Sequence, residues 1–352
     1  MTERFTTRAL EPAEYPDWEK FVAESPDGSI YSLPSYLEVL CAATGARYRI
    51  LAVFRDGVIV GGVALYVSSS PVGNYVAPRF LLYYNGLVLA RSSSKYPSQR
   101  TSLSLHIMDA LESALQKEGY AHLRLHSRAT ISDVRPFLAK GWSARPSFSY
   151  VVDLSDIESA RNRIERNFRR LIKRCEQDGI VMSQDDDFES FFALHDEIHR
   201  RKGVPLYLRE PRYREYYLKL RERSLCKLFH ARLPQGQSIA SQLVLLGPHP
   251  ISHTVCAGAA EEYLKTGASV FLRWKACEAL AADGYEGNDL TDAELNPVTR
   301  FKSQLGAELK LSFMLHRQDA VGWRVRNAAL RPFNFSRRAL RAVQRRIASR
   351  GA

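Results

Sequence analysis

Hydrophobic and polar residues recur along the chain with two different periods. Apolar residues three or four positions apart indicate helices, whereas short alternating or continuous apolar runs indicate strands. Residues 48–69 predict two strands that meet at Asp56-Gly57, a dipeptide typical of a two-residue hairpin turn. Residues 226–259 show a similar pattern, with turn residues at 234–236 and 247–250. Each half of the chain therefore begins with antiparallel strands.

In each half, the first strands are followed by a helix, a strand, a shorter helix and a final strand. Both helices of each half end in a glycine, the residue best suited to a left-handed C-cap. Helices and strands that alternate with short links are typical of α/β proteins. These elements are expected at residues 103–119, 121–127, 134–141 and 147–154 in the first half, and at 269–284, 285–291, 297–306 and 311–317 in the second.

The two halves repeat each other at an offset of 165 residues. Eight identical pairs fall between residues 114–148 and 279–313, among them Gly119 with Gly284 and Ser147 with Ser312. A repeat of this length indicates two copies of one domain.

We therefore predict an α/β (α+β) fold with two tandem domains, each a mixed, mostly antiparallel sheet flanked by helices. A length of 352 residues agrees with two domains. A single amphipathic helix, with Ser155 as its N-cap and Gly179 as its end, is expected to join the halves. The expected boundaries are 1–155 and 181–320 for the domains, 156–180 for the basic junction helix and 321–352 for a basic helical tail.

Positive charge is concentrated in two segments of a chain whose net charge is +12. Residues 161–174 carry seven Arg or Lys against one Glu, and nine arginines but no acidic residue follow Asp319. Such segments suit nucleic acid or an anionic membrane surface, although a solubilising surface has the same composition. The candidate nucleic-acid-binding residues are Arg169, Arg170, Lys173, Arg174, Arg338, Arg341 and Arg345.

Several classes of chemistry have no sequence signature here. The five cysteines are scattered without a CxxC pair, and the His195/His199 pair lacks the HExxH order, so we expect neither a disulfide framework nor a metal site. The chain contains no GxSxG, Walker A or GxGxxG motif. It also lacks a signal peptide and any run of roughly 18 apolar residues, which predicts a cytoplasmic protein.

Two polar features stand at positions suited to ligand binding. Asp289, a candidate catalytic residue, comes where a buried strand of the second half should end, and polar groups at strand ends commonly line clefts in α/β domains. Thr266, Gly267 and Ser269 precede or begin a helix, whose N-terminal N–H groups can bind a phosphate or carboxylate. The alternatives are a turn carboxylate for Asp289 and a simple helix cap for the second group.

Four segments together resemble a known family over residues 25–316. They are "GSIYSLPSYLEVL", "NFRRLIKRCEQDG", "KGVPLYLREPRYREYYLKL" and "GASVFLRWKACEALAADGYEGNDLTDAELNPVTRFKSQLGAEL". The pattern resembles the FemABX-type aminoacyltransferases and the FemAB-like acyltransferases, which are built from two GNAT-type domains in tandem. The resemblance implies an acyltransferase, with a first domain that is structural and binds the acceptor, and a second domain that binds the donor and carries the catalytic residues.

The resemblance also implies roles for individual residues. Phe301 and Lys302 match an aromatic-lysine pair at the reaction centre, where the lysine is thought to stabilise charge on the ester or its tetrahedral intermediate. The first repeat has Phe137 at the position of Lys302, so only the second half keeps this cation. Arg209 matches an arginine that holds acceptor phosphates. Tyr213 and Tyr216 could pack on a sugar or base of the bound substrate, although tyrosines at this spacing are more often part of the core.

Three hypotheses remain open on the sequence. The first is transfer of an aminoacyl group from aminoacyl-tRNA, a substrate and not a bound cofactor, to an amine of a cell-envelope precursor or small metabolite. The second is the same fold using acyl-CoA in polysaccharide or lipid modification, although Leu264 and Ser269 depart from the usual CoA-binding loop. The third is a non-catalytic protein that binds RNA or the membrane surface through its arginine-rich tail.

Overall fold

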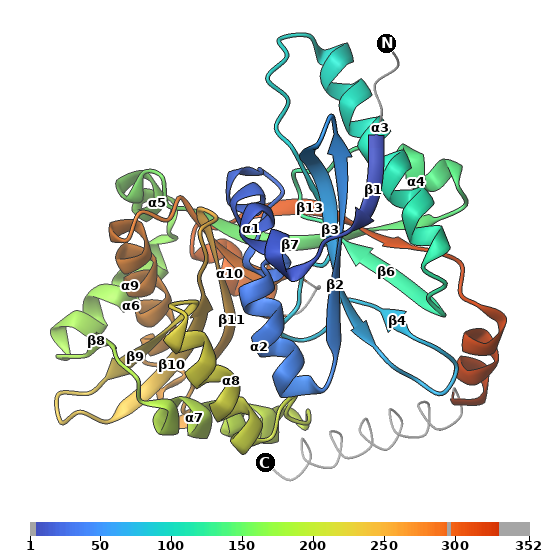
Figure 1. Ribbon diagram of the computed structural model, residues 1–352. Coiled ribbons are helices and arrows are strands. Elements are labelled where there is room, and N and C mark those ends of the chain that lie inside the picture. The colour runs from blue at the N-terminus through green and yellow to red at the C-terminus, as the bar shows by residue number, and fades with distance from the viewer. Residues whose placement is uncertain (1–4, 294–296, 331–352) are drawn as a thin grey trace.

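The computed structural model describes residues 5–293 and 297–330 (Figure 1). Within these residues one sheet of thirteen strands runs through the molecule in the order β1-β2-β3-β4-β6-β13-β7-β12-β11-β10-β9-β8, and β5 pairs with β3. The strands are β1 (Phe5–Ala9), β2 (Arg47–Arg55), β3 (Val58–Ser68), β4 (Tyr75–Val76), β5 (Leu87–Leu89), β6 (His122–His126), β7 (Ser143–Asp153), β8 (Val181–Gln184), β9 (Cys226–Arg232), β10 (Ser238–Leu245), β11 (Ile251–Ala259), β12 (Gly287–Asp292) and β13 (Glu308–His316).

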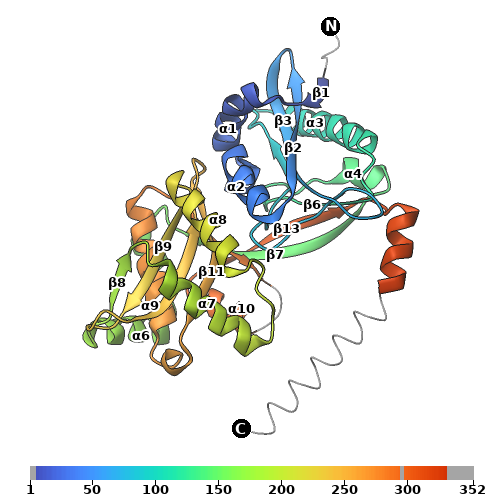
Figure 2. The same cartoon turned by 60° about the horizontal axis from the view of Figure 1, so that its bottom comes forward.

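Helices flank this sheet in both halves (Figures 1 and 2). They are α1 (Tyr15–Glu24), α2 (Pro34–Thr44), α3 (Pro97–Lys117), α4 (Arg135–Ala139), α5 (Ile157–Arg163), α6 (Arg166–Gln177), α7 (Phe188–Lys202), α8 (Glu210–Glu222), α9 (Ala268–Ala282) and α10 (Pro297–Gln304), followed by helical residues 321–330. The mixed α/β fold predicted from the sequence is confirmed. No helix among the described residues has the length and apolar character needed to cross a bilayer.

The predicted hairpin and the predicted repeat are both confirmed. Asp56 and Gly57 have φ angles of 51° and 83°, and the strands that they join pair antiparallel from Arg55 and Val58 onward. The order α3-β6-α4-β7 in the first half recurs as α9-β12-α10-β13 in the second. The helix-ending Gly141 and Gly306 both have positive φ angles, of 82° and 84°. The residue type that the turn needs is therefore conserved between the two copies.

The two halves exchange their last strands. β13, at the end of the second half, pairs with β6 of the first half, whereas β7 of the first half pairs with β12 of the second. β7 and β13 also pair with each other, and the repeat-related Ser147 and Ser312 lie directly opposite one another. Figure 2 shows these two long strands running between the two lobes. The sheet is therefore continuous, and the boundaries expected near residues 155 and 181 stay a prediction.

The junction at 156–180 differs from the single helix that we predicted. It forms α5 and α6, separated at Ile164, whose backbone is extended (φ −67°, ψ 132°), and Asp156 is the N-cap in place of Ser155. At the break, the Glu165 N–H donates to the Gln304 carbonyl over 3.0 Å. A Cβ on Gly306 would lie 3.1 Å from that of Arg163. The interruption therefore allows the junction to pack closely against the end of α10.

Candidate active site

A cavity of about 420 Å³ lies in the second half, where two parallel strands separate. β11 and β12 are paired in parallel only from Ile251 with Gly287 to His253 with Asp289. Beyond that point α9 and α10 contribute to the walls. The polar and aromatic residues that line it include Gln242, Cys256, Ser269, Arg273, Phe301 and Lys302.

The end of β12 has an irregular backbone beside this cavity. The register with β7 shifts between Asp289 and Asp292, and Thr291 has a φ angle of 53°. A left-handed conformation is costly for a β-branched residue, and such strain commonly occurs at functional sites. The Lys302 Nζ donates to the carbonyl of Thr291 over 2.6 Å and also to that of Asp292. The irregular strand end therefore anchors this lysine.

Lys302 is a buried cation whose ammonium group has one hydrogen-bond donor left for a ligand. Its exposed fraction is 6%, and burial, reinforced by the positive charge of Arg273, lowers its pKa to about 8, against the opposing effects of Asp292 and Asp289. An ammonium group has three donors. Two of them are used by the carbonyls, which leaves one for a ligand in the cavity. Lys302 thus lies at the wall of this cavity, and its role at a reaction centre stays a prediction.

Arg273 and Gln242 are lining residues that the sequence analysis missed. The Arg273 guanidinium lies 5.5 Å from the centre of the Phe301 ring, and its Nη1 is buried without a hydrogen-bond partner among the described residues. Burial lowers the pKa of Arg273 to about 10. Both amide atoms of Gln242 are likewise buried and unpartnered within the described chain. Buried polar groups are normally paired, so these atoms mark where a ligand would bind.

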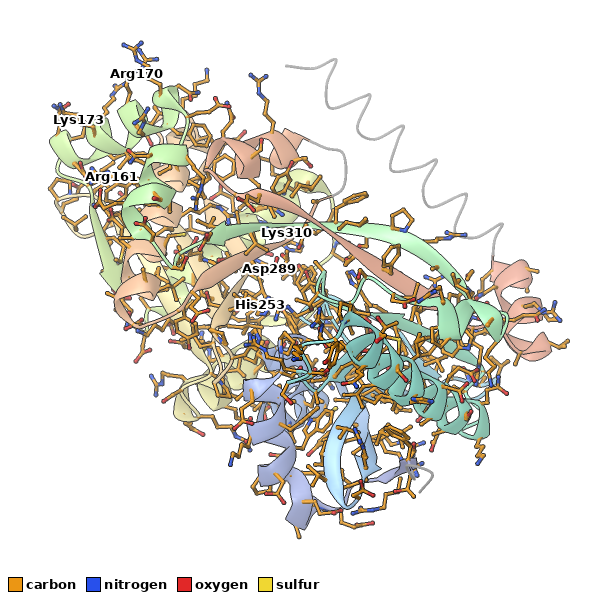
Figure 3. All side chains as sticks on the ribbon, turned by 90° about the horizontal axis from the view of Figure 1, so that it is seen from above. Arg161, Arg170, Lys173, His253, Asp289 and Lys310 are labelled. Atoms are coloured by element: carbon orange, nitrogen blue, oxygen red, sulfur yellow. The ribbon has the colours of Figure 1, made fainter. Side chains whose placement is uncertain are left out.

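Asp289 lies behind the cavity and does not line it. It is 2% exposed, accepts a hydrogen bond from Tyr84 Oη over 2.7 Å, and accepts another from the Thr291 N–H over 2.7 Å. Burial raises the pKa of its carboxyl group. Figure 3 shows Asp289 and His253 close together in the middle of the molecule. In this structure Asp289 therefore fixes the strand end that anchors Lys302, whereas we had expected a catalytic contact.

The three candidate residues at the start of α9 have different structural roles. Thr266 Oγ1 accepts from the Ala268 N–H over 3.2 Å and donates to the Tyr263 carbonyl over 2.7 Å, so it holds the turn before the helix, whose N-cap residue is Gly267. A Cβ on Gly267 would lie 2.7 Å from that of Leu171, which accounts for the glycine by close packing. Of the three candidate residues here, only Ser269 lines the cavity.

The structure also corrects the expectation for the α8 tyrosines. Tyr213 and Tyr216 are fully buried in the core. The Tyr213 hydroxyl contacts Cys256 Sγ at 3.0 Å, and the Tyr216 hydroxyl contacts that of Tyr36 at 3.0 Å. Neither ring presents a face to a sugar or base, because other side chains cover both. Arg209 is exposed at the N-cap of α8 and is not part of the cavity lining.

The basic residues of the junction form an exposed face on α6. Arg169, Arg170, Lys173 and Arg174 are all exposed, and Arg170 and Lys173 project from one end of the molecule in Figure 3. On the opposite side of the same helix, the Phe168 ring packs 5.3 Å from that of Phe301. The basic face and the cavity are therefore separated by one helix. Arg338, Arg341 and Arg345 lie outside the described residues.

Comparison with known proteins agrees with this description. Residues 159–303, which include α6, α9 and most of α10, match the family model of an acetyltransferase (GNAT) domain. No curated protein matches the chain. The domain match supports the enzyme class expected from the sequence, an acyltransferase.

Solved structures similar to the chain share its whole architecture. FemX has a TM-score of 0.69 at 13% identity, over 87% of this chain and 96% of its own. The C-terminal domain of a putative lysylphosphatidylglycerol synthetase from Agrobacterium fabrum has a TM-score of 0.56 at 12% identity, over 91% and 97%. L-PGS from Bacillus licheniformis has a TM-score of 0.55 at 14% identity, over 89% and 94%. The predicted resemblance to the FemAB-like fold is confirmed.

Proposed function

We propose that this protein is an N-acyltransferase of FemABX type. In this proposal it transfers an aminoacyl group from aminoacyl-tRNA to an amine of a cell-envelope precursor or a small metabolite. The observation that carries the proposal is Lys302, a buried cation that two carbonyls anchor at the wall of a cavity. Arg273 and Gln242 line the same cavity, and each has buried polar atoms without a hydrogen-bond partner among the described residues. A cytoplasmic location, where charged tRNA is available, follows from the proposal.

The reaction needs no covalent enzyme intermediate. The acceptor amine attacks the ester carbonyl carbon, and a tetrahedral intermediate with an oxyanion forms. The N–H donor of Lys302 that the two carbonyls leave over is suited to this oxyanion. The ester C–O bond then breaks, the amide forms, and one proton of the attacking amine passes to the departing tRNA ribose oxygen, which leaves as a hydroxyl. A fixed donor of this kind lowers the barrier by about 3–4 kcal/mol.

The charge distribution favours a donor rich in phosphate. The exposed cations of α6 lie on the outer face of a helix whose inner face contacts Phe301. Arg161, Arg169 and Lys173 also line a groove of about 470 Å³ between α6 and α9. A tRNA whose phosphates contact α6 could place its acylated 3′ end beside Lys302.

A second cavity provides a place for the acceptor. Its volume is about 590 Å³, and its lining includes Arg79, Arg145 and Phe148. Tyr83 and Asp292 line both this cavity and the one at Lys302. Donor and acceptor would thus approach the end of β12 from opposite sides. Two arginines with aromatic neighbours suit an anionic acceptor, such as a phosphate-bearing envelope precursor.

The family match keeps acyl-CoA as an alternative donor, since its model describes an acetyltransferase domain. A direct comparison decides between the two donors. It measures the transfer of labelled amino acids from a charged tRNA pool to a panel of amines, and the transfer of labelled acetyl groups from acetyl-CoA to the same amines. We expect transfer from charged tRNA only, with RNA binding that weakens at least tenfold between about 50 and 200 mM salt. Transfer from acetyl-CoA alone would refute the tRNA proposal.

The non-catalytic hypothesis makes the opposite prediction for variants. If the function were binding of RNA or the membrane surface by the basic tail, truncation after Asp319 would abolish this function and Lys302→Ala would preserve it. Our proposal requires that Lys302→Ala loses transfer whether or not the tail is present.

A further inference from the structure

Two histidines and an aspartate converge at a place that the proposed reaction does not use. His122 begins β6, His316 ends β13, and Asp319 precedes the helical residues 321–330. Asp319 Oδ1 lies 2.6 Å from His122 Nδ1 and 2.9 Å from His316 Nε2. One ligand atom from each residue lies within 4.8 Å of the others. Three potential ligand atoms therefore lie close together, although His122 is 197 positions from Asp319 in the sequence.

We propose that His122, His316 and Asp319 bind one divalent transition-metal ion, of which Zn²⁺ is the natural probe. Two imidazole nitrogens and one carboxylate suit zinc or its first-row neighbours, whereas Mg²⁺ and Ca²⁺ prefer oxygen ligands. Three protein ligands leave a position for water. The metal would replace the two histidine contacts of Asp319, and each ligand atom would then lie about 2.0–2.2 Å from the ion.

The surroundings support metal binding. His122 is buried, with an exposed fraction of 6%. The Trp323 ring lies flat against His122, with ring centres 4.9 Å apart and planes 11° apart, and it also contacts Tyr75 at 4.9 Å. Arg317 donates to the carbonyls of Leu115 and Tyr120. The chain on both sides of Asp319 is thus fixed against the first half.

The metal would fasten the C-terminal segment to the body of the protein. Residues 321–330 lie on the opposite side of the molecule from α6 in both Figure 1 and Figure 2, and none of the three ligands lines the Lys302 cavity. The proposed metal therefore lies apart from the Lys302 cavity, and it would link β6 and β13 to the segment before the helical residues 321–330. This role does not depend on which acyl donor the enzyme uses.

Zinc titration of the intact, EDTA-treated protein against a chromophoric zinc chelator tests the proposal. We expect one tight site per chain and a rise in thermal unfolding temperature when Zn²⁺ is added. Asp319→Asn keeps the side-chain size and one acceptor oxygen but removes the charge, so it should weaken Zn²⁺ affinity at least tenfold. His199→Ala, which removes a histidine of the other close pair, is the matched control and should leave affinity unchanged.

Co²⁺ binding provides a second readout that does not depend on thermal stability. Wild-type protein should give a visible Co²⁺ absorption band that Zn²⁺ displaces, and His316→Ala should lose it. Absence of a one-to-one site, or equal affinity in wild-type protein and Asp319→Asn, would overturn the proposal and leave a hydrogen-bonded His-Asp-His cluster. Loss of the site in His199→Ala alone would also overturn it, because the ion would then lie on α7.

Discussion

Replacing Lys302 by methionine removes the ammonium group while keeping an unbranched side chain of similar length. If the remaining donor of Lys302 stabilises the oxyanion, its loss should lower kcat about 10²–10³-fold, the range found when one oxyanion-hole donor is removed. Arg273, another donor that lines the cavity, lies over the Phe301 ring and belongs to a different helix, α9. We therefore do not expect it to replace the lysine.

The effect of the same substitution on stability contains two opposing contributions. The pKa of Lys302 falls from 10.5 to about 8, which corresponds to a cost of about 3 kcal/mol for keeping this cation buried, and methionine removes that cost. Methionine also leaves the Thr291 and Asp292 carbonyls without their donor, at about 1–3 kcal/mol each. The two contributions nearly cancel, so the free energy of unfolding should change by a few kcal/mol at most.

The assay is steady-state acyl transfer at saturating donor and acceptor, at a temperature where thermal unfolding shows the variant to be folded. Lys310→Met is the matched control, because Lys310 is 41% exposed and pairs with Glu308 on β13. The control should retain wild-type turnover. A Lys302→Met enzyme that is folded and turns over within twofold of wild type would refute the role assigned to Lys302.

Three further predictions follow from the same structure. The pKa of Lys302 near 8 predicts that kcat falls as the pH rises above about 8, because only the protonated lysine can stabilise the oxyanion. Lys302→Arg should move this fall to higher pH. A pH–rate profile that rises through pH 8 would contradict the assignment. Changing Arg169, Arg170 and Lys173 to Gln should reduce the slope of log affinity for tRNA against log salt by about 2–3, whereas changing the exposed Lys20, Arg91 and Lys117 to Gln should leave it unaltered. In chemical denaturation, Gly306→Ala should lower the free energy of unfolding by more than Gly45→Ala does. Both glycines have a positive φ, but of the two only Gly306 has neighbours within 4 Å of an added Cβ. Equal losses of stability would show that the contact with the α5–α6 junction is unimportant.

Local sequence signals predicted the elements and their repetition. The Asp56-Gly57 turn needs two residues that tolerate positive φ, and Gly141 and Gly306 end equivalent helices, so each is visible in the sequence. The exchange of β7 and β13 was not predictable, because alternation of apolar residues defines a strand but not the strand beside it. The break at Ile164 was missed for a similar reason, since it depends on a contact with Gln304, 140 positions away.

The site was predicted only in part. Lys302 was found through its family position and through its difference from Phe137 in the first copy. Tyr213 and Tyr216 were overestimated, because an aromatic stripe on a helix has the same spacing whether it is core or ligand-binding. The signal missed was a polar residue inside an apolar element: Gln242 interrupts the apolar strand β10, and Arg273 stands within the largely buried helix α9.

The most direct test of the central claim is the affinity of a non-reactive donor analogue, a tRNA 3′ end with an amide in place of the ester. Titration calorimetry should show that Arg273→Met weakens binding at least tenfold, because the buried guanidinium loses its ligand. Arg145→Met, which changes the second cavity, should leave the affinity unchanged. Equal binding by wild-type protein and Arg273→Met would place the donor outside the Lys302 cavity and contradict the proposed function.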